Sequence, residues 1–223
     1  MPMSSKYYIT TPIYYVNAVP HVGHAYTTVV ADCLARYWRA QGRRVYFLTG
    51  TDEHGQKIQK AAEELNLTPL DFTNRISPKF QELWRVMEIS NDDFIRTTEP
   101  RHVAAVQEVL NILKASDHLY AGEYGGWYCI PCETFWMEGQ LQGGKCPDCQ
   151  RSVEYIKEKN YFFRLSRYQD WLIKHLHDHP DFIFPKTRYN EVLSFLENNK
   201  LEDLCISRPR SRLSWGIPFP FDK

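Results

Sequence analysis

The chain has 223 residues, 43% of them hydrophobic and 14% aromatic, which is enough for one large domain or two smaller ones and excludes a disordered protein. Lys and Arg balance Asp and Glu at 27 each, so the zero net charge argues against a protein that coats phosphate backbones. The sequence contains neither the roughly 18–20 apolar residues of a membrane span nor a secretory signal.

The first 117 residues carry the pattern of an α/β fold with a doubly wound parallel sheet. Aromatic, β-branched and apolar runs predict strands at 6–10, 45–49 and 93–95. Apolar residues at helical spacing predict helices at about 23–40, 58–65, 71–87 and 102–115, and Pro78 is expected to divide or kink the third. Strands and helices that alternate over short links form βαβ units.

The chain changes character near residue 119. Residues 120–153 are rich in Gly, Cys, Tyr and Trp and predict a small, metal-stapled, β-rich insertion. A strand at 161–164 and helices at 168–177 and 189–197 are expected to follow. The predicted domains are therefore 1–117, the first half of a nucleotide-binding domain; 118–185, the insertion; and 186–223, the return toward the first domain.

Four of the six cysteines form two CxxC pairs separated by thirteen residues, Cys129 and Cys132, then Cys146 and Cys149. Two such turns supply four thiolates in a tetrahedron, which leaves no open position and predicts one structural Zn²⁺ per chain. Two disulfides or a redox pair are the alternatives; neither CxxC lies between the strand and helix of a βαβ unit, which argues against the redox pair. The cysteine pattern favours a reduced, cytoplasmic setting.

A second motif, Pro20-His21-Val22-Gly23-His24, follows the first strand and opens the first long helix. A helix N-terminus presents unpaired N–H groups to phosphate, and the two imidazoles can stabilise charge on phosphorus. Taken alone, the pattern fits capping histidines as well as a nucleotide site. The chain has neither GxGxxG nor a P-loop, so the usual dinucleotide and P-loop enzymes lose support.

Several segments together resemble the class I aminoacyl-tRNA synthetases, and among them the methionyl enzymes. The segments are TPIYYVN at 11–17, HVGH at 21–24, GTDEHG at 50–55, the two CxxC pairs, ISR at 206–208 and SWGIP at 214–218. The resemblance implies the first half of a Rossmann-like catalytic core with a zinc-knuckle connective insertion. It also implies ATP-dependent activation of L-methionine to methionyl-adenylate, with Mg²⁺ accompanying ATP, and transfer to tRNA(Met).

The resemblance assigns roles to individual residues. His21 and His24 are expected to be catalytic. The expected ATP-binding residues are Asn17, His21, Gly23, His24 and Arg208, and the expected methionine-binding residues are Ile13, Tyr15 and Asp52. Without the resemblance, core packing is the alternative for Tyr15, and a helix N-cap is the alternative for Asp52.

Two departures from the family are expected to matter. No KMSKS loop occurs in the chain, and the strand that would complete the methionine pocket would follow Lys223. The chain is therefore expected to be a fragment with little activity alone.

The sequence leaves two rival functions open. One is a non-catalytic zinc-ribbon module, derived from a synthetase, that binds RNA or another protein. Its candidate contacts are Lys157, Lys159, Arg164, Arg167, Arg208, Arg210 and Arg212. The simpler explanation is that these basic residues form an ordinary solvated surface and that the aromatic residues between them belong to the core. The other rival is an adenylate-forming or nucleotidyl-transferring enzyme that uses a different acceptor. The TPIYYVN and GTDEHG segments argue against this rival.

Overall fold

The computed structural model describes residues 5–132 and 134–222, which form two compact units. The first unit is Met1–Glu108 together with Leu213–Lys223, and the second is Val109–Arg212. The predicted domains 1–117, 118–185 and 186–223 have different limits. Because compactness alone does not define a domain, those limits stay a prediction.

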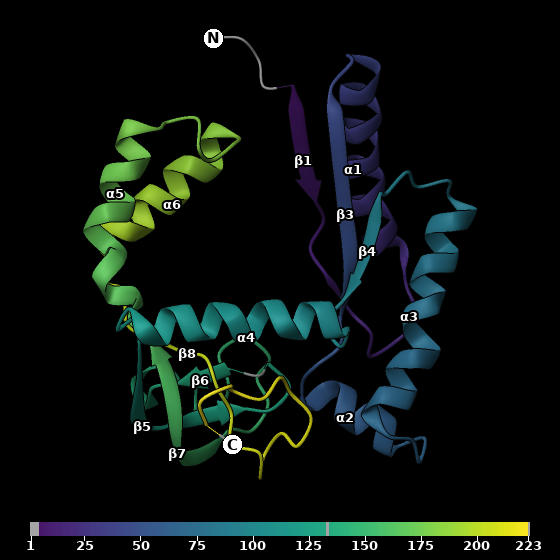
Figure 1. Ribbon diagram of the computed structural model, residues 1–223. Coiled ribbons are helices and arrows are strands. Elements are labelled where there is room, and N and C mark those ends of the chain that lie inside the picture. Colours follow the sequence, from purple (N-terminus) through teal and green to yellow (C-terminus); the bar gives the residue numbers. More distant parts are fainter. Residues whose placement is uncertain (1–4, 133, 223) are drawn as a thin grey trace. The chain divides into compact units, whose positions relative to one another are not determined.

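A parallel sheet forms the centre of the first unit (Figure 1). Its strands are β1 (Lys6–Thr10), β2 (Tyr14–Tyr15), β3 (Arg44–Asp52) and β4 (Asp93–Arg96). Leu48 of β3 pairs with Thr10 on one side and Asp93 on the other. Thr51 likewise pairs with Tyr14 and with β4, so β1 and β2 follow one edge of β3 and β4 the other. The predicted parallel α/β fold is confirmed.

Four helices accompany this sheet: α1 (Val22–Ala40), α2 (Gln56–Glu63), α3 (Pro69–Val86) and α4 (Pro100–Ala115), the last of which continues into the second unit. The main core is a cluster of buried apolar side chains: Tyr14, Val16, Ile58, Ala62, Phe72, Phe80 and Trp84. Pro78 is expected to divide or kink α3; a division is wrong, since one helix runs through it, and a kink stays a prediction. Buried Phe80 and Trp84 follow the proline in α3, and their packing offsets the hydrogen bond that Pro78 cannot make.

The second unit is built on an antiparallel sheet in the order β6-β5-β7-β8. Its strands are β5 (Leu119–Cys129), β6 (Thr134–Trp136), β7 (Glu154–Phe163) and β8 (Leu204–Cys205). Helices α5 (Gln169–Asp178) and α6 (Lys186–Asn198) pack together through buried Leu176, Tyr189 and Leu196. The strand predicted at 161–164 is only the end of β7, because charged residues obscure the earlier part of that strand in the sequence.

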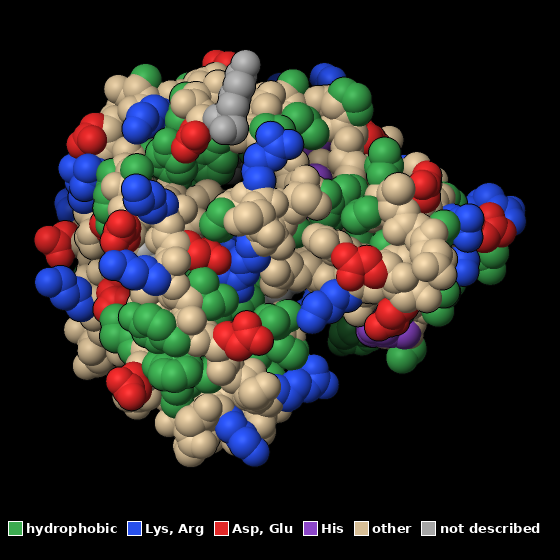
Figure 2. Space-filling view, turned by 90° about the horizontal axis from the view of Figure 1, so that it is seen from below, with side chains coloured by type: hydrophobic (Ala, Val, Ile, Leu, Met, Phe, Trp, Pro, Cys, Tyr) green, Lys and Arg blue, Asp and Glu red, His purple; other side chains and the backbone are tan. Residues whose placement is uncertain are grey.

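Charged side chains of both signs are interspersed on the face seen in Figure 2, as the balanced composition leads one to expect. A face with one dominant sign would be the usual mark of a protein that binds a phosphate backbone. Among the described helices, none has the length and apolar character required to cross a membrane.

Close contact between β3 and β4 requires glycine at position 50. A Cβ built on Gly50 would overlap the backbone carbonyl oxygen of Ile95, which cannot move without breaking the strand pairing. Gly50→Ala is therefore expected to lower the free energy of unfolding by about 2–3 kcal/mol, measured by urea denaturation. Gly139→Ala is the control, because a Cβ at Gly139 would meet nothing within 4 Å. Equal effects of the two changes would contradict the packing described.

Candidate functional site

Tyr15 and Asp52 lie side by side at the carboxyl ends of two neighbouring strands. Tyr15 of β2 is the register partner of Asp52 of β3, and the strands are parallel. Register partners in adjacent strands project to the same face of a sheet, at the edge where open α/β sheets bind ligands. The N-cap of α2 is Gly55, which makes no side-chain capping bond, so the N-cap alternative for Asp52 is wrong.

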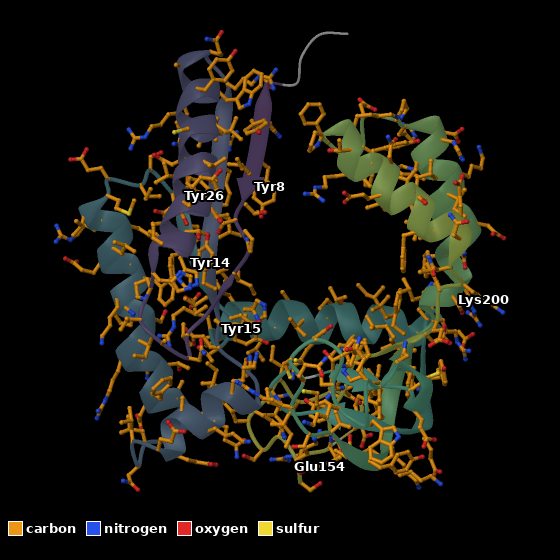
Figure 3. The ribbon with its side chains drawn as sticks, turned by 180° about the vertical axis from the view of Figure 1, so that it is seen from behind. Tyr8, Tyr14, Tyr15, Tyr26, Glu154 and Lys200 are labelled. Atoms are coloured by element: carbon orange, nitrogen blue, oxygen red, sulfur yellow. The ribbon has the colours of Figure 1, made fainter. Side chains whose placement is uncertain are left out.

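The preceding residue, Tyr14, connects this pair to the start of α1 (Figure 3). Tyr14 is buried, and its hydroxyl shares a 2.8 Å hydrogen bond with the Thr28 hydroxyl. Its ring centroid lies 4.8 Å from that of His24. The dipeptide of β2 thus places one tyrosine beside Asp52 and packs the other against a histidine of the HVGH motif.

His21 and His24 cap α1 with both imidazoles. The Nδ1 atom of His21 accepts a hydrogen bond from the Gly23 amide at 3.1 Å, and Nδ1 of His24 accepts one from the His21 amide at 3.2 Å. The two rings stack with their centroids 3.8 Å apart. Because each Nδ1 is an acceptor, each neutral ring carries its proton on Nε2.

Burial, and to a lesser extent the neighbouring His21, lowers the pKa of His24 below its ordinary value, so this ring is neutral at pH 7. The pair therefore offers two Nε2–H donors at a helix N-terminus, where the backbone dipole also favours an anion. The capping role foreseen from the sequence is present, and it leaves these donors available to phosphate oxygens.

The other residues expected at this site flank β2 or open α1. Gly23 leaves room for the His21 ring, because a Cβ at position 23 would lie 3.0 Å from Cε1 of that ring. Ile13 and Asn17 are exposed on either side of β2. Their roles in binding methionine and ATP stay predictions.

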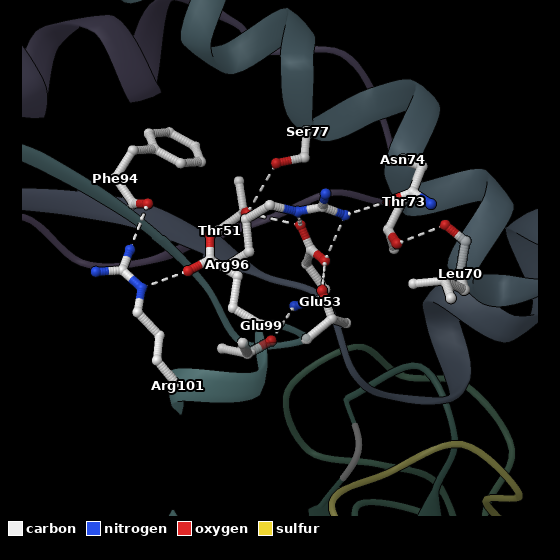
Figure 4. Close-up of polar contacts among 12 residues, drawn as sticks. Thr51, Glu53, Leu70, Thr73, Asn74, Ser77, Phe94, Arg96, Glu99 and Arg101 are labelled. Atoms are coloured by element: carbon white, nitrogen blue, oxygen red, sulfur yellow. Dashed lines mark hydrogen bonds and ion pairs between the residues drawn. The ribbon is translucent and has the colours of Figure 1, made fainter. Parts of the chain in front are cut away.

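Glu53 is a component of this region that the sequence did not reveal. The residue is fully buried, and Arg96 of β4 donates to its two carboxylate oxygens at 2.7 and 2.9 Å (Figure 4). Hydroxyls of Thr98 and Thr51 donate to the same carboxylate at 2.6 and 2.9 Å. Burial alone would raise the pKa of Glu53, but these bonds outweigh it and hold the pKa below its ordinary value. This network anchors the residue next to Asp52.

The two CxxC pairs of the second unit converge. The Sγ atoms of Cys129, Cys132, Cys146 and Cys149 all lie within 4.8 Å of one another. Cys129 and Cys149 are 3.4 Å apart and Cys132 and Cys146 are 3.8 Å apart, and all four cysteines are free. A tetrahedron with Zn–S bonds of about 2.3 Å has sulfurs about 3.8 Å apart, so the donor set fits a metal ion and not two disulfides.

The pKa shifts differ in direction among the sulfurs of the cluster. Burial raises the pKa of Cys146, but the amides of Cys149 and Asp148 donate to its sulfur and lower its pKa to about 7. The hydrogen bond with Cys149 raises the pKa of Cys132 to about 12. The cluster therefore favours thiolate at one sulfur and resists it at another, and a bound cation would stabilise all four as thiolates.

Most basic residues considered for RNA binding are engaged inside the second unit. Arg164 and Arg167 both pair with Asp117. Arg212 is only 11% exposed, pairs with Glu158 at 2.7 Å and lies 3.6 Å above the Tyr128 ring. The burial and pairing of Arg212 favour a structural role for this residue over nucleic-acid contact.

Arg208, expected near the adenylate, also lies in the second unit, where it donates to the Ser207 carbonyl at 2.7 Å. Its guanidinium is 5.4 Å from the Phe135 ring centroid. Its role in binding ATP stays a prediction.

Comparisons with known proteins agree on one family. The profile of the class I tRNA synthetases (M) matches residues 7–155 and 151–223. A methionine--tRNA ligase of Clostridium acetobutylicum is 52% identical over 223 residues, which are 100% of this chain and 34% of that protein. One from Thermotoga maritima is 50% identical over 97% of this chain and 35% of its own length. The chain thus spans about a third of the length of these relatives.

Solved structures give the same result. Mycobacterium tuberculosis methionyl-tRNA synthetase in complex with methionyl-adenylate matches with a TM-score of 0.91 and 42% identity, over 97% of this chain and 43% of that one. The apo form of the same enzyme matches with a TM-score of 0.76 and 39% identity, over 97% and 41% of the two chains.

Proposed function

This chain belongs to the class I tRNA synthetases (M), and from that premise we propose that it supplies the substrate-activating part of a methionine--tRNA ligase. The expected fold is confirmed: it is the first half of a Rossmann-like synthetase core with an insertion that carries the cysteine cluster. Because the chain spans about a third of its relatives, the proposed activity is that of the whole protein.

In the proposed reaction the methionine carboxylate attacks the α-phosphorus of ATP and pyrophosphate leaves. The acyl group of the adenylate then passes to a hydroxyl of the terminal ribose of tRNA(Met), and AMP leaves. No protein nucleophile is required, so catalysis consists of positioning the substrates and stabilising charge. The observation that carries the proposal is the arrangement around β2, in which Tyr15 adjoins Asp52 while Tyr14 contacts His24.

The proposed roles follow from the chemistry of each side chain. Asp52 binds the α-ammonium of methionine, and Tyr15 and Ile13 line the thioether pocket, where an aromatic ring favours sulfur. His21 and His24 donate from Nε2 to phosphate oxygens as charge develops on them. The remaining ATP contacts are Asn17, Gly23 and Arg208, with Mg²⁺ accompanying the phosphates.

The four-cysteine cluster is proposed to hold one structural Zn²⁺. Four sulfur ligands leave no position for substrate or water, so the ion would stabilise the fold and take no part in the reaction. Free cysteines and a thiolate metal site both suit a reducing compartment, and the proposed location is the cytoplasm.

Methionine-dependent exchange of pyrophosphate into ATP by the full-length protein tests the function. Asp52→Asn keeps the side-chain shape but removes the charge that pairs with the ammonium. It is expected to raise the KM for methionine roughly 10–100-fold, with a much smaller change for ATP. Asp181→Asn, at an exposed position in the second unit, is the control and should leave both constants unchanged. A folded full-length protein without methionine-dependent exchange would refute the proposal.

A further inference from the structure

The return segment of the first unit makes an aromatic contact with the turn that follows Asp52. Trp215 belongs to the stretch Leu213–Lys223, which rejoins the first unit after the insertion. Its ring centroid lies 5.0 Å from that of His54, at an interplanar angle of 48°. His54 is two residues beyond Asp52, so residues distant in sequence meet at the turn.

The turn lies outside strand and helix, and its backbone is held at Glu53, whose amide donates to the Thr97 hydroxyl at 2.9 Å. The strand β3 ends at Asp52 and α2 begins at Gln56, which leaves Glu53, His54 and Gly55 outside both elements. Gly55 adopts φ 121°, a conformation that side-chain-bearing residues rarely take, so the chain redirects sharply there. Strand pairing fixes the backbone of Asp52, and contacts made by the residues after it fix the direction in which the chain leaves the strand.

Two such contacts fix consecutive residues of the turn. Glu53 is held by Arg96, Thr98 and Thr51, as described above. His54 is held by packing against Trp215, and burial lowers the pKa of His54, which keeps the imidazole neutral at pH 7. The ion-pair network thus holds Glu53, and the aromatic contact holds the next residue, His54.

Trp215 is well placed to serve as a fixed support. It packs against the main core cluster of the first unit, which contains Tyr14. Its segment is tied down by Gln107, whose side-chain amide donates to the Pro218 carbonyl at 3.0 Å. The indole Nε1–H is buried and has no acceptor within the described residues, so the ring is held by its shape and packing.

We propose that Trp215 is a positioning residue for methionine binding: it fixes His54 and, through the turn, the direction of the Asp52 carboxylate. This inference rests on the proposed function. It adds a determinant that lies on the return segment, about 160 residues along the chain from the turn that it supports.

Pyrophosphate exchange by the full-length protein provides the test. Trp215→Ala is expected to raise the KM for methionine ~10-fold while the KM for ATP changes less than ~2-fold, because the ring that Trp215 contacts, His54, lies two residues beyond Asp52. Trp215→Phe keeps an aromatic ring at this position and needs no N–H acceptor. It should therefore leave the KM values for methionine and ATP as in the wild type. Trp38→Ala is the matched control, because Trp38 is partly buried in the same unit but contacts Tyr7 and Arg43.

A double-variant cycle identifies the route. If Trp215 acts through His54, the protein with both Trp215→Ala and His54→Ala should bind methionine no worse than the one with His54→Ala alone. Additive effects, equal rises in both KM values, or an unchanged KM for methionine in a folded Trp215→Ala protein would each overturn the inference. If the wild-type protein catalyses methionine-dependent exchange and one of these results is found, only the role of Trp215 is refuted. If the wild-type protein shows no such exchange, the proposed function is refuted as well.

Discussion

Glu53→Ala is expected to lower the free energy of unfolding by about 3–5 kcal/mol, among the largest effects of any single substitution in the first unit. The change removes a fully buried carboxylate and leaves the charge of Arg96, which is only 21% exposed, without its ion-pair partner. Two threonine hydroxyls and the Asn74 side chain would also have to rearrange around that guanidinium. Urea denaturation at pH 7 measures the loss.

A second glutamate–arginine pair gives a matched control. Glu82 and Arg85 are separated by 2.6 Å, but both are exposed, at 58% and 72%. Glu82→Ala is expected to cost less than about 1 kcal/mol, because solvent screens the exposed charges and side-chain entropy offsets the attraction. Similar losses for Glu53→Ala and Glu82→Ala would show that burial of the Glu53 network contributes nothing.

The same carboxylate makes stability depend on pH. The pKa of Glu53 is lowered in the folded protein, so its stabilising effect is complete above the unfolded-state pKa of about 4.3 and is lost as the pH falls below it. Glu53→Gln cannot titrate at this position. The difference in unfolding free energy between wild type and Glu53→Gln should therefore be largest near pH 7 and shrink progressively below about pH 4. A difference that is constant from pH 7 to pH 3 would contradict the ionised state of Glu53.

Local patterns in the sequence predicted the parts of the site that depend on local structure. The HVGH motif opens α1 as expected, because a helix start is decided within one turn of the chain. The CxxC spacing likewise predicted the convergence of four sulfurs, since each pair is fixed by its own tight turn.

Partners distant in the chain were not predictable in this way. Nothing around Glu53 indicates that Arg96 will meet it, because that contact exists only once β3 and β4 lie in register. The sequence pattern predicts no strand at Tyr14–Tyr15, since two residues are too few to show an alternating pattern. The register of β2 with β3 nevertheless brings Tyr15 to Asp52.

Loss of metal is expected to unfold the cysteine-bearing part of the second unit. Residues 137–153 contain one short 3-10 helix, Glu138–Gln140, and two isolated β-bridges, so backbone hydrogen bonds alone hold them weakly. Structural zinc bound to four thiolates contributes on the order of 10–16 kcal/mol in small domains. That free energy is large compared with the stabilisation that this segment gains from its own few contacts.

Metal analysis and limited proteolysis together test this expectation. The purified protein should contain one zinc per chain, and a strong chelator or Cys146→Ser should release it and open residues 137–153 to rapid cleavage. Cys33→Ser is the control: Cys33 is an exposed free cysteine on α1 outside the cluster, so zinc content and cleavage should stay as in the wild type. Cys146→Ser protein that keeps its metal, or a metal-free wild type that resists cleavage, would remove the basis for a structural ion. Because a tetrahedral site needs every ligand, Cys129→Ser, which removes another buried sulfur, should behave as Cys146→Ser does.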